Sequence, residues 1–245
     1  MSDAPVPELL APTRRMRLAE DVADKVRAAI LHGQFSPGQH LREDELATRL
    51  QVSRGPIREA FAVLEREGLV DVTPHRGATV VQLTPADLTD VYSLRTGLEV
   101  VATQLAVRRG TEQDFAQADA VLAEFARALK GKVTEQDAAR LDLEFHDVFY
   151  RAARNERLHA SWLSVRSQVY LFLLQRNIAN QDWRKKSITG HADILAAVRS
   201  RDEKLAVKLI TGHISYAYSL ISSSYDDRTD GRLDLMAPRL GMKTD

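Results

Sequence analysis

The sequence predicts a mainly α-helical protein in two parts: a small N-terminal part that ends in a β-hairpin, and a larger all-helical C-terminal part. Three observations lead to this prediction. The 245 residues include only 12 glycines and 8 prolines. Apolar residues recur at helical spacing over long stretches. The β-rich runs of the chain fall together between residues 69 and 83.

The composition narrows the range of functions. The chain has 34 Lys and Arg against 34 Asp and Glu, so no net charge points to nucleic acid, membrane or acidic partners. It has no cysteine, which excludes a disulfide framework, Cys-ligated zinc or iron–sulfur clusters, and thiol catalysis. Residues 1–17 lack the apolar core of a signal peptide, and no run of about 18 apolar residues occurs. We therefore expect a cytoplasmic protein with no membrane contact.

The N-terminal part begins with an arm and a helix. Residues 1–16 hold three prolines without apolar periodicity, which predicts a flexible arm. From Arg17 the pattern becomes helical, with apolar residues at four-residue steps at Leu18, Val22, Val26 and Ile30. Residues 32–39 are rich in turn formers and end this helix.

Two further helices and a hairpin complete residues 17–83. A helix over 43–50 is expected to bury Leu46, Ala47 and Leu50. Ser53 is placed to cap a third helix, which keeps one apolar stripe of Ile57, Ala60, Phe61 and Leu64 and ends at Gly68. The runs 69–73 and 77–83 then form a hairpin. The order of helix, helix–turn–helix and two-stranded wing is typical of a winged helix-turn-helix.

A repeated helix-start pattern marks the second part. Thr84 is followed by a proline at the first helical position and by Asp87, and the same Thr-x-x-Asp spacing recurs from Thr111 and Thr134. Each start precedes a long amphipathic stretch. About six helices are expected over residues 84–225, near 86–109, 112–130, 135–153, 156–179, 182–199 and 202–222. Residues 226–245 mix charges without periodicity and are expected to form a flexible tail.

The third helix has the chemistry of a DNA-recognition helix. The major groove of DNA admits one helix, which must carry basic or polar residues at its N-terminal end and an apolar back. Ser53, Arg54 and Arg58 lie at the exposed start, and residues 75–77 form the tip of the wing, where they could enter the minor groove. However, acidic residues nearly balance the basic ones in this part, and a winged helix can also serve protein contacts.

Four polar residues of the second part suggest a metal site. Asp142 and His146 are one helical turn apart, while His191 and His213 lie on or beside apolar stripes of two other helices. Buried polar groups must find partners, and a divalent metal would satisfy all four. Three imidazoles and one carboxylate suit Zn²⁺ or Ni²⁺ and leave positions open for a ligand. Taken singly, each residue could instead be structural, as a satisfied core histidine or a surface pair.

The run LREDELATRLQVSRGPIREAFAVLEREGLVDVTPHRGATV resembles the DNA-binding domain of GntR-family bacterial transcription regulators. It is similar to that family's signature over about forty positions. The resemblance implies that Arg54 and Arg58 contact DNA, with Ser53 beside them and His75, Arg76 and Gly77 in the wing. Some relatives carry another DNA-contacting Arg where this chain has Asp44; Arg42 or Arg49 could substitute for it.

The pieces YSLRTGLE, DLEFHDVFYRAARN, HADILAAV and DEKLAVKLITGH resemble the FCD domain, an antiparallel helical bundle that binds ligands in one GntR subfamily. The resemblance implies a divalent metal held by Asp142, His146, His191 and His213, and a small carboxylate or sugar-acid effector beside it. Arg95 is the expected partner of the effector carboxylate, or else pairs with Glu99. Arg176 could also face the effector, or could be solvated.

These observations predict a homodimeric, ligand-responsive regulator, expected to act as a repressor, that binds a palindromic operator in double-stranded DNA. Two alternatives remain. A His₃Asp metal could activate water in a hydrolase, although no general base stands at a readable spacing, since Glu144 lies on another side of its helix. A pure metal sensor would respond to the metal alone.

Overall fold

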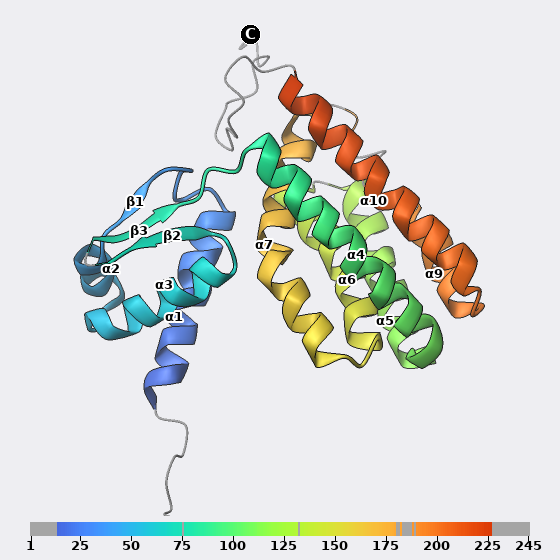
Figure 1. Cartoon of the computed structure of the whole chain (residues 1–245), viewed down its shortest axis with the longest axis horizontal. Helices are drawn as coiled ribbons and strands as arrows, with labels where there is room; N and C mark the ends of the chain where they lie inside the picture. The colour runs from blue at the N-terminus through green and yellow to red at the C-terminus, as the bar shows by residue number, and fades with distance from the viewer. Residues whose placement is uncertain are drawn as a thin grey trace, which may run out of the picture.

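The computed structural model describes residues 14–74, 76–131, 133–179, 182, 188 and 190–226. A small N-terminal part with a sheet lies beside a bundle of longer helices (Figure 1). Both predicted parts and the mainly helical fold class are thereby confirmed. No helix within these ranges is long and apolar enough to cross a membrane.

The N-terminal part contains three helices and three short strands. They are α1 (Arg14–Leu31), β1 (His40–Leu41), α2 (Glu43–Leu50), α3 (Arg54–Arg66), β2 (Val70–Thr73) and β3 (Gly77–Val80). Helix α1 begins within the span expected to be an arm, and the rest of that arm, residues 1–13, lies outside the described residues. The wing is also larger than the predicted hairpin, because β1 pairs with β3 and gives a three-stranded antiparallel sheet in the order β1-β3-β2.

The backbone at Gly77 explains how the third strand fits. Gly77 pairs with Thr73 across the hairpin, and its φ of +97° lies in the region that favours glycine. A Cβ at this position would collide with the carbonyl oxygen of Leu41 in β1. Glycine at the start of β3 therefore lets the short strand β1 approach closely.

The apolar stripes predicted for this part form its core. Leu46, Ala47 and the stripe of α3 are buried, as expected, whereas Leu50 is only partly buried and Leu18 is 38% exposed. Ser53 occupies the N-cap position of α3 in an extended conformation, but its side chain makes no capping hydrogen bond. The start of α3 therefore remains open toward solvent.

The C-terminal part is a helical bundle. Its helices are α4 (Pro85–Arg109), α5 (Glu112–Lys130), α6 (Glu135–Ala152), α7 (Glu156–Ala179), α9 (His191–Arg199) and α10 (Glu203–Asp226). The side chains of Thr84, Thr111 and Thr134 each accept a hydrogen bond from the backbone N–H three residues later, so all three predicted helix starts are confirmed. The helix expected near 182–199 is seen only as α9, and residues 227–245 of the expected tail lie outside the described residues.

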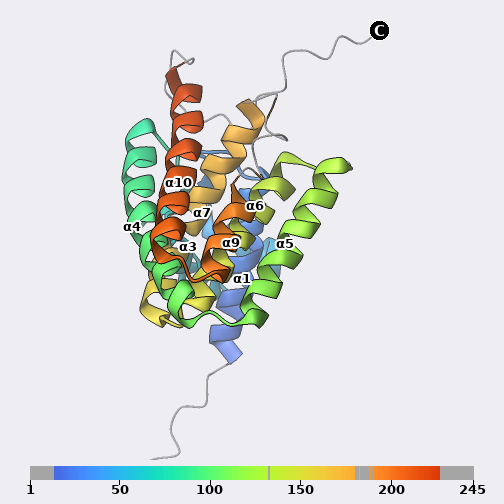
Figure 2. The ribbon, with the colours of Figure 1, turned by 90° about the vertical axis from the view of Figure 1, so that its right-hand side faces the viewer.

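Helix α7 joins the two parts. It is the bundle helix nearest to the N-terminal part in Figure 1, and it also packs on α4, α6 and α10. The amide of Gln168 in α7 donates to the carbonyl oxygen of Gly68, just after α3, at 3.2 Å. Glu67 accepts from Arg27 of α1 at 2.6 Å, and Ser167 lies 3.5 Å from the same carboxylate. Figure 2 shows α9 and α10 on the bundle face away from the N-terminal part.

Candidate functional site

The N-terminal part carries a charged cleft at the start of its third helix. The cleft has a volume of about 680 Å³ and is lined from α2, α3 and the sheet by His40, Arg42, Glu43, Asp44, Arg54, Arg58, Arg76 and Gly77. Five of the predicted DNA-contacting residues therefore lie together: four arginines and Gly77. Ser53 is exposed at the adjoining N-cap, and His75 lies outside the described residues.

Two of these arginines are paired with carboxylates of α2. Arg58 Nε donates to Glu43 Oε2 at 2.7 Å. Arg42 lies 3.4 Å from Asp44, and this hydrogen bond raises the pKa of Arg42 and lowers the pKa of Asp44. Sequence reasoning did not assign a role to Glu43, because its partner is fifteen residues further along the chain and only the fold brings them together.

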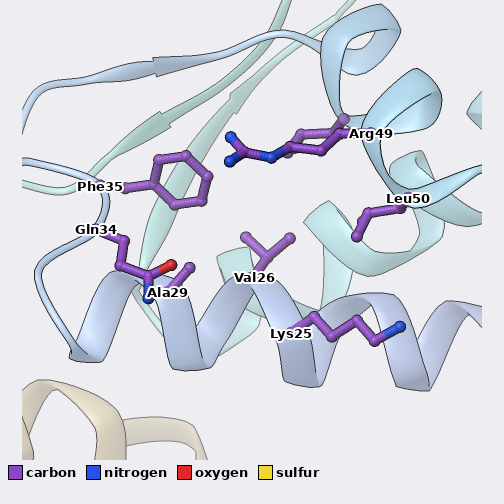
Figure 3. A pocket seen from close by; sticks show the side chains of 8 residues that line it. Lys25, Val26, Ala29, Gln34, Phe35, Arg49 and Leu50 are labelled. Carbon is purple, nitrogen blue, oxygen red and sulfur yellow. The ribbon is translucent and has the colours of Figure 1, made fainter.

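Arg49, the second candidate to replace the missing arginine, lies elsewhere. It lines a separate pocket of about 560 Å³ between α1, the following turn and α2. Figure 3 shows its guanidinium extending over this pocket toward Phe35, above Val26 of α1. Of the two candidates, therefore, only Arg42 lies in the cleft with Arg54 and Arg58.

The bundle brings three histidines together in its interior. His146 of α6, His191 at the start of α9 and His213 of α10 each offer a ring nitrogen, and these atoms lie within 4.8 Å of one another. Gly190, with a φ of +86°, precedes His191, and a Cβ added there would lie 3.5 Å from Nδ1 of His213. This turn starts α9 so that the His191 ring lies beside His213, with ring centroids 4.5 Å apart.

Asp142 completes the cluster. Its Oδ1 is 3.5 Å from Nε2 of His191, and its Oδ2 is 3.8 Å from Nε2 of His146. The side chain is 1% exposed, and neither oxygen has a hydrogen-bond partner among the described residues. Burial alone would raise the pKa of Asp142, but interactions with the His191 ring and the Arg176 guanidinium outweigh burial and lower that pKa.

The donor set fits a divalent metal. Burial lowers the pKa of His191 to about 4 and lowers the pKa of His213 well below its usual value, so both rings are neutral and can offer lone pairs near neutral pH. The Asp142 carboxylate, which has no hydrogen-bond partner among the described residues, lies beside them. Three imidazoles and one carboxylate form a suitable ligand set for zinc and similar ions.

Glu99 orients one of these histidines. Its Oε1 lies 3.0 Å from Nδ1 of His146, on the opposite edge of the ring from Nε2. Burial would raise the pKa of Glu99, but His146 and Arg95 lower it, which favours a carboxylate. In metal sites, a carboxylate placed against the free ring nitrogen of a ligating histidine fixes the tautomer and orientation of that ring, and Glu99 is placed to do this for His146. Sequence reasoning considered Glu99 only as a helix partner of Arg95.

Further buried polar side chains accompany the cluster. Arg95 is 1% exposed and lies 3.3 Å from Glu99, so its expected partner is present, yet its two terminal nitrogens have no hydrogen-bond partner among the described residues. Partnerless polar atoms also occur on four buried neighbours from α4, α6 and α7: Tyr92, Thr103, Tyr150 and Gln175. Arg176 is likewise buried and lies 3.9 Å from Asp142. Sequence reasoning missed the four neutral residues, which carry no pattern of their own.

Comparisons with known proteins identify the family of each part of the chain. The family model "FCD domain" matches residues 90–216, and the model "Bacterial regulatory proteins, gntR family" matches residues 18–80. The Nta operon transcriptional regulator of Aminobacter aminovorans is 30% identical over 76% of this chain and 86% of its own length. The probable D-xylose utilization operon transcriptional repressor of Paenarthrobacter nicotinovorans is 30% identical over 82% and 87%.

Solved structures show the same fold. A putative GntR transcriptional regulator from Rhodococcus sp. RHA1 covers 84% of this chain and matches over 98% of its own length, with a TM-score of 0.68 and 24% identity. Escherichia coli McbR/YncC gives the same TM-score over 85% and 98%, with 21% identity. The relatives above are transcription regulators, as is the repressor RspR of Escherichia coli at 27% identity, and none is an enzyme. The chain belongs to the GntR family of DNA-binding transcriptional regulators, in the subfamily with a C-terminal FCD domain.

Proposed function

We propose that the chain is a cytoplasmic, homodimeric repressor whose bundle binds a divalent metal and a small organic acid, and that the acid releases the protein from its operator. Residues 17–83 would bind DNA, and residues 84–225 would bind the effector and dimerise, with residues 1–16 and 226–245 as flexible ends. One observation carries the proposal: the His₃Asp cluster adjoins a buried arginine, Arg95, whose terminal nitrogens have no hydrogen-bond partner among the described residues.

The charged cleft supports the DNA-binding assignment. Arg54 and Arg58 stand at the open start of α3, where they would reach base edges, with Ser53 beside them. Arg42 would contact a phosphate, and Arg49 could reach the backbone from the other side of α2. His75, Arg76 and Gly77 would bring the wing to the minor groove.

A substitution tests this assignment. Arg58→Ala should weaken binding to DNA selected in vitro by about 1–3 kcal/mol, because it removes a base-reading side chain. Arg66→Ala removes an exposed arginine from the other end of α3 and serves as the control. The two affinities are compared by fluorescence anisotropy. An Arg58→Ala protein that binds as tightly as wild type would contradict the assignment.

The metal would be held by Asp142, His146, His191 and His213, with Zn²⁺ or Ni²⁺ as the expected ion. When bound, it supplies a fixed positive charge against which a carboxylate can bind. The protein would contribute three imidazoles, an ionised Asp142 and the Glu99 carboxylate that would orient His146. Because these side chains are buried, water would compete only weakly with them for the metal.

Arg95 and Arg176 would bind the effector carboxylate. Both are buried next to the cluster, and the terminal nitrogens of Arg95, which have no hydrogen-bond partner among the described residues, can bind an anion of matching geometry. The partnerless hydroxyl and amide groups around them would bind hydroxyls of a sugar acid or hydroxy acid. The name of the Paenarthrobacter relative, a D-xylose operon repressor, is consistent with a small, polar effector.

Helix α7 would couple effector and DNA. It carries Arg176 near the cluster, and two to three turns earlier it carries Ser167 and Gln168, which contact the residues that follow α3. A shift of α7 on effector binding would therefore move the end of the recognition helix directly.

A thermal-shift screen of small carboxylic and sugar acids tests the proposal on metal-loaded and chelator-stripped protein. An acid at about 100 times its Kd should add about 2.7 kcal/mol, or roughly 5–10 °C at this size. The shift should vanish on stripping, and it should vanish in Arg95→Ala while metal binding persists. Stabilisation by metal alone, with no acid active, would favour the pure metal sensor instead.

A further inference from the structure

The N-terminal part holds an apolar pocket between its first two helices. Helices α1 and α2 both pack on α3, and a space of about 560 Å³ remains between them. Apolar side chains of α1, the following turn and α2 line it: Val26, Ala29, Phe35, Leu46 and Leu50. Val26 and Leu46 are 2% and 7% exposed and belong to the core, so the pocket reaches down to the core of this part. Ligand pockets of proteins have volumes of about 300–1,000 Å³, so this space is large enough for a small molecule.

Two helix ends hold the walls of this pocket in place. Helix α1 is followed by Gly33, whose φ of +70° lies in the left-handed region. The backbone N–H of Gln34 donates to the carbonyl oxygen of Ala29 at 2.8 Å, which turns the chain back over α1 and brings Phe35 to the pocket. Helix α2 ends in a similar turn at Gln51, whose φ is +56°. Backbone hydrogen bonds of the chain itself therefore form the pocket.

The charged side chains at this pocket are basic. Within the part of the chain that the structure describes, they are Lys25 and Arg49, both exposed and neither in an ion pair. By contrast, Arg42 and Arg58 of the neighbouring charged cleft each face a carboxylate. Figure 3 shows the Arg49 guanidinium extending over the pocket toward Phe35. An apolar interior with unpaired positive charges at its rim is complementary to an amphipathic anion.

We propose that this pocket binds an aromatic carboxylate, and that the bound carboxylate takes Arg49 away from the DNA backbone. A flat ring can pack against Phe35 and Val26, while its carboxylate, held in line with the ring, reaches the guanidinium above. Arginine binds a carboxylate through two parallel hydrogen bonds, which fixes the ligand in this direction. The inference goes beyond the proposed function, and only its effect on DNA rests on the DNA contact proposed for Arg49.

Titration with 2-naphthoate tests whether the pocket binds such a ligand. Isothermal titration calorimetry compares this acid with 2-naphthamide, which has the same ring without the charge and should bind about tenfold or more weakly. Because the bundle is also proposed to bind an acid, each titration of the metal-loaded full chain is repeated with Arg95→Ala. Binding should persist in Arg95→Ala. Loss of binding in that variant would assign the probe to the bundle and overturn the pocket.

Substitutions in the Arg95→Ala protein locate the site. Arg49→Gln should raise the Kd for 2-naphthoate about tenfold or more, whereas Arg66→Gln, which changes an exposed arginine of α3, should leave it unchanged. Ala29→Phe fills the pocket and should abolish binding, while Ala62→Phe places the same side chain on the exposed side of α3. Because Arg49 is exposed, Arg49→Gln tests the pocket even if Ala29→Phe does not fold.

Fluorescence anisotropy with selected DNA measures the competition for Arg49, again in the Arg95→Ala protein. Saturating 2-naphthoate should raise the Kd for DNA. It should also lower the slope of log affinity against log salt by about 0.9, since one phosphate contact is lost. Arg49→Gln should show both changes without the probe, and the probe should add nothing to them. A bound probe that leaves the Kd for DNA unchanged would overturn the competition.

The outcomes separate this inference from the proposed function. A Kd for 2-naphthoate above about 1 mM in Arg95→Ala, or an equal Kd in Arg49→Gln, overturns the pocket ligand while the regulator and its bundle site stand. A chain that binds no selected DNA contradicts the proposed function and leaves the probe titrations valid. If deletion of residues 1–13 tightens 2-naphthoate binding about tenfold or more, that segment occupies the pocket, and the assignment to a small molecule is overturned.

Discussion

Single residues of the metal cluster divide into those that sequence could reveal and those that only the fold reveals. Asp142 and His146 share one helix face by spacing alone, and the resemblance to FCD domains implied His191 and His213. Glu99 could not be assigned in this way, because it reaches His146 from another helix. The same holds for Glu43, which reaches Arg58 across the helix–turn–helix. A residue that orients another side chain cannot be recognised from a sequence motif when the two residues lie on different helices.

The role of Glu99 leads to a prediction at this scale. Glu99→Gln should weaken metal binding about 10- to 100-fold, because a neutral amide orients and polarises His146 less well than a carboxylate. Glu144→Gln, which removes a carboxylate that pairs with Arg140 on the same helix, is the control and should leave metal affinity unchanged. Competition with a chromophoric chelator measures both. Equal metal affinities of the two variants would show that Glu99 does not support metal binding.

The buried His191 predicts a pH dependence of stability in metal-stripped protein. Burial lowers its pKa to about 4 in the folded state, against 6.5 in a model compound. As the pH falls from about 6.5 to about 4, His191 binds a proton in the unfolded chain but not in the folded chain. The free energy of unfolding therefore decreases over this pH window. Between pH 7 and pH 5 His191 alone should account for roughly 2 kcal/mol of the loss in urea titrations, and His213, whose pKa is also lowered by burial, adds a loss of the same sign. His191→Phe should therefore reduce this slope; an unchanged slope would assign it to other groups.

At the scale of elements, the helices were predictable because local chemistry sets their ends. The three Thr-x-x-Asp starts gave the first residues of α4, α5 and α6 within one position. Strand β1 was missed, because its two residues, His40 and Leu41, carry no alternation and form a strand only by pairing with β3. Pairing of this kind is decided by tertiary contacts, which a local pattern does not contain.

Gly77 provides a test of this tertiary element. Gly77→Ala places a Cβ against the carbonyl oxygen of Leu41, so it should destabilise the protein by about 1–3 kcal/mol beyond the backbone cost of a positive φ. Gly38→Ala should lose only the stability that a positive φ costs an alanine, since its Cβ would meet only Gln82 at 4.0 Å. Urea unfolding compares the two proteins. If Gly77→Ala lowers the free energy of unfolding no more than Gly38→Ala does, β1 moves away from the added Cβ without a loss of stability.

At the scale of the whole molecule, α7 links the two functional parts. Near its C-terminal end it carries Arg176, 3.9 Å from Asp142, and its middle contacts the residues that follow α3. The family signature predicted both domains from sequence, but the contact of Gln168 with Gly68 joins residues one hundred positions apart and could not be read from either domain alone. Under the proposed function, effector binding and DNA binding would be connected through this helix.

The most direct test of this account is the affinity of the metal-loaded protein for in vitro selected DNA, measured by fluorescence anisotropy with and without the acid found in the thermal-shift screen. The account predicts that the acid raises the Kd for DNA about tenfold or more, a coupling of about 1.4 kcal/mol. The Arg95→Ala protein should bind the DNA with the wild-type Kd, and the acid should not change that Kd. An acid that stabilises the wild-type bundle yet leaves its Kd for DNA unchanged would contradict the claim that this domain controls DNA binding.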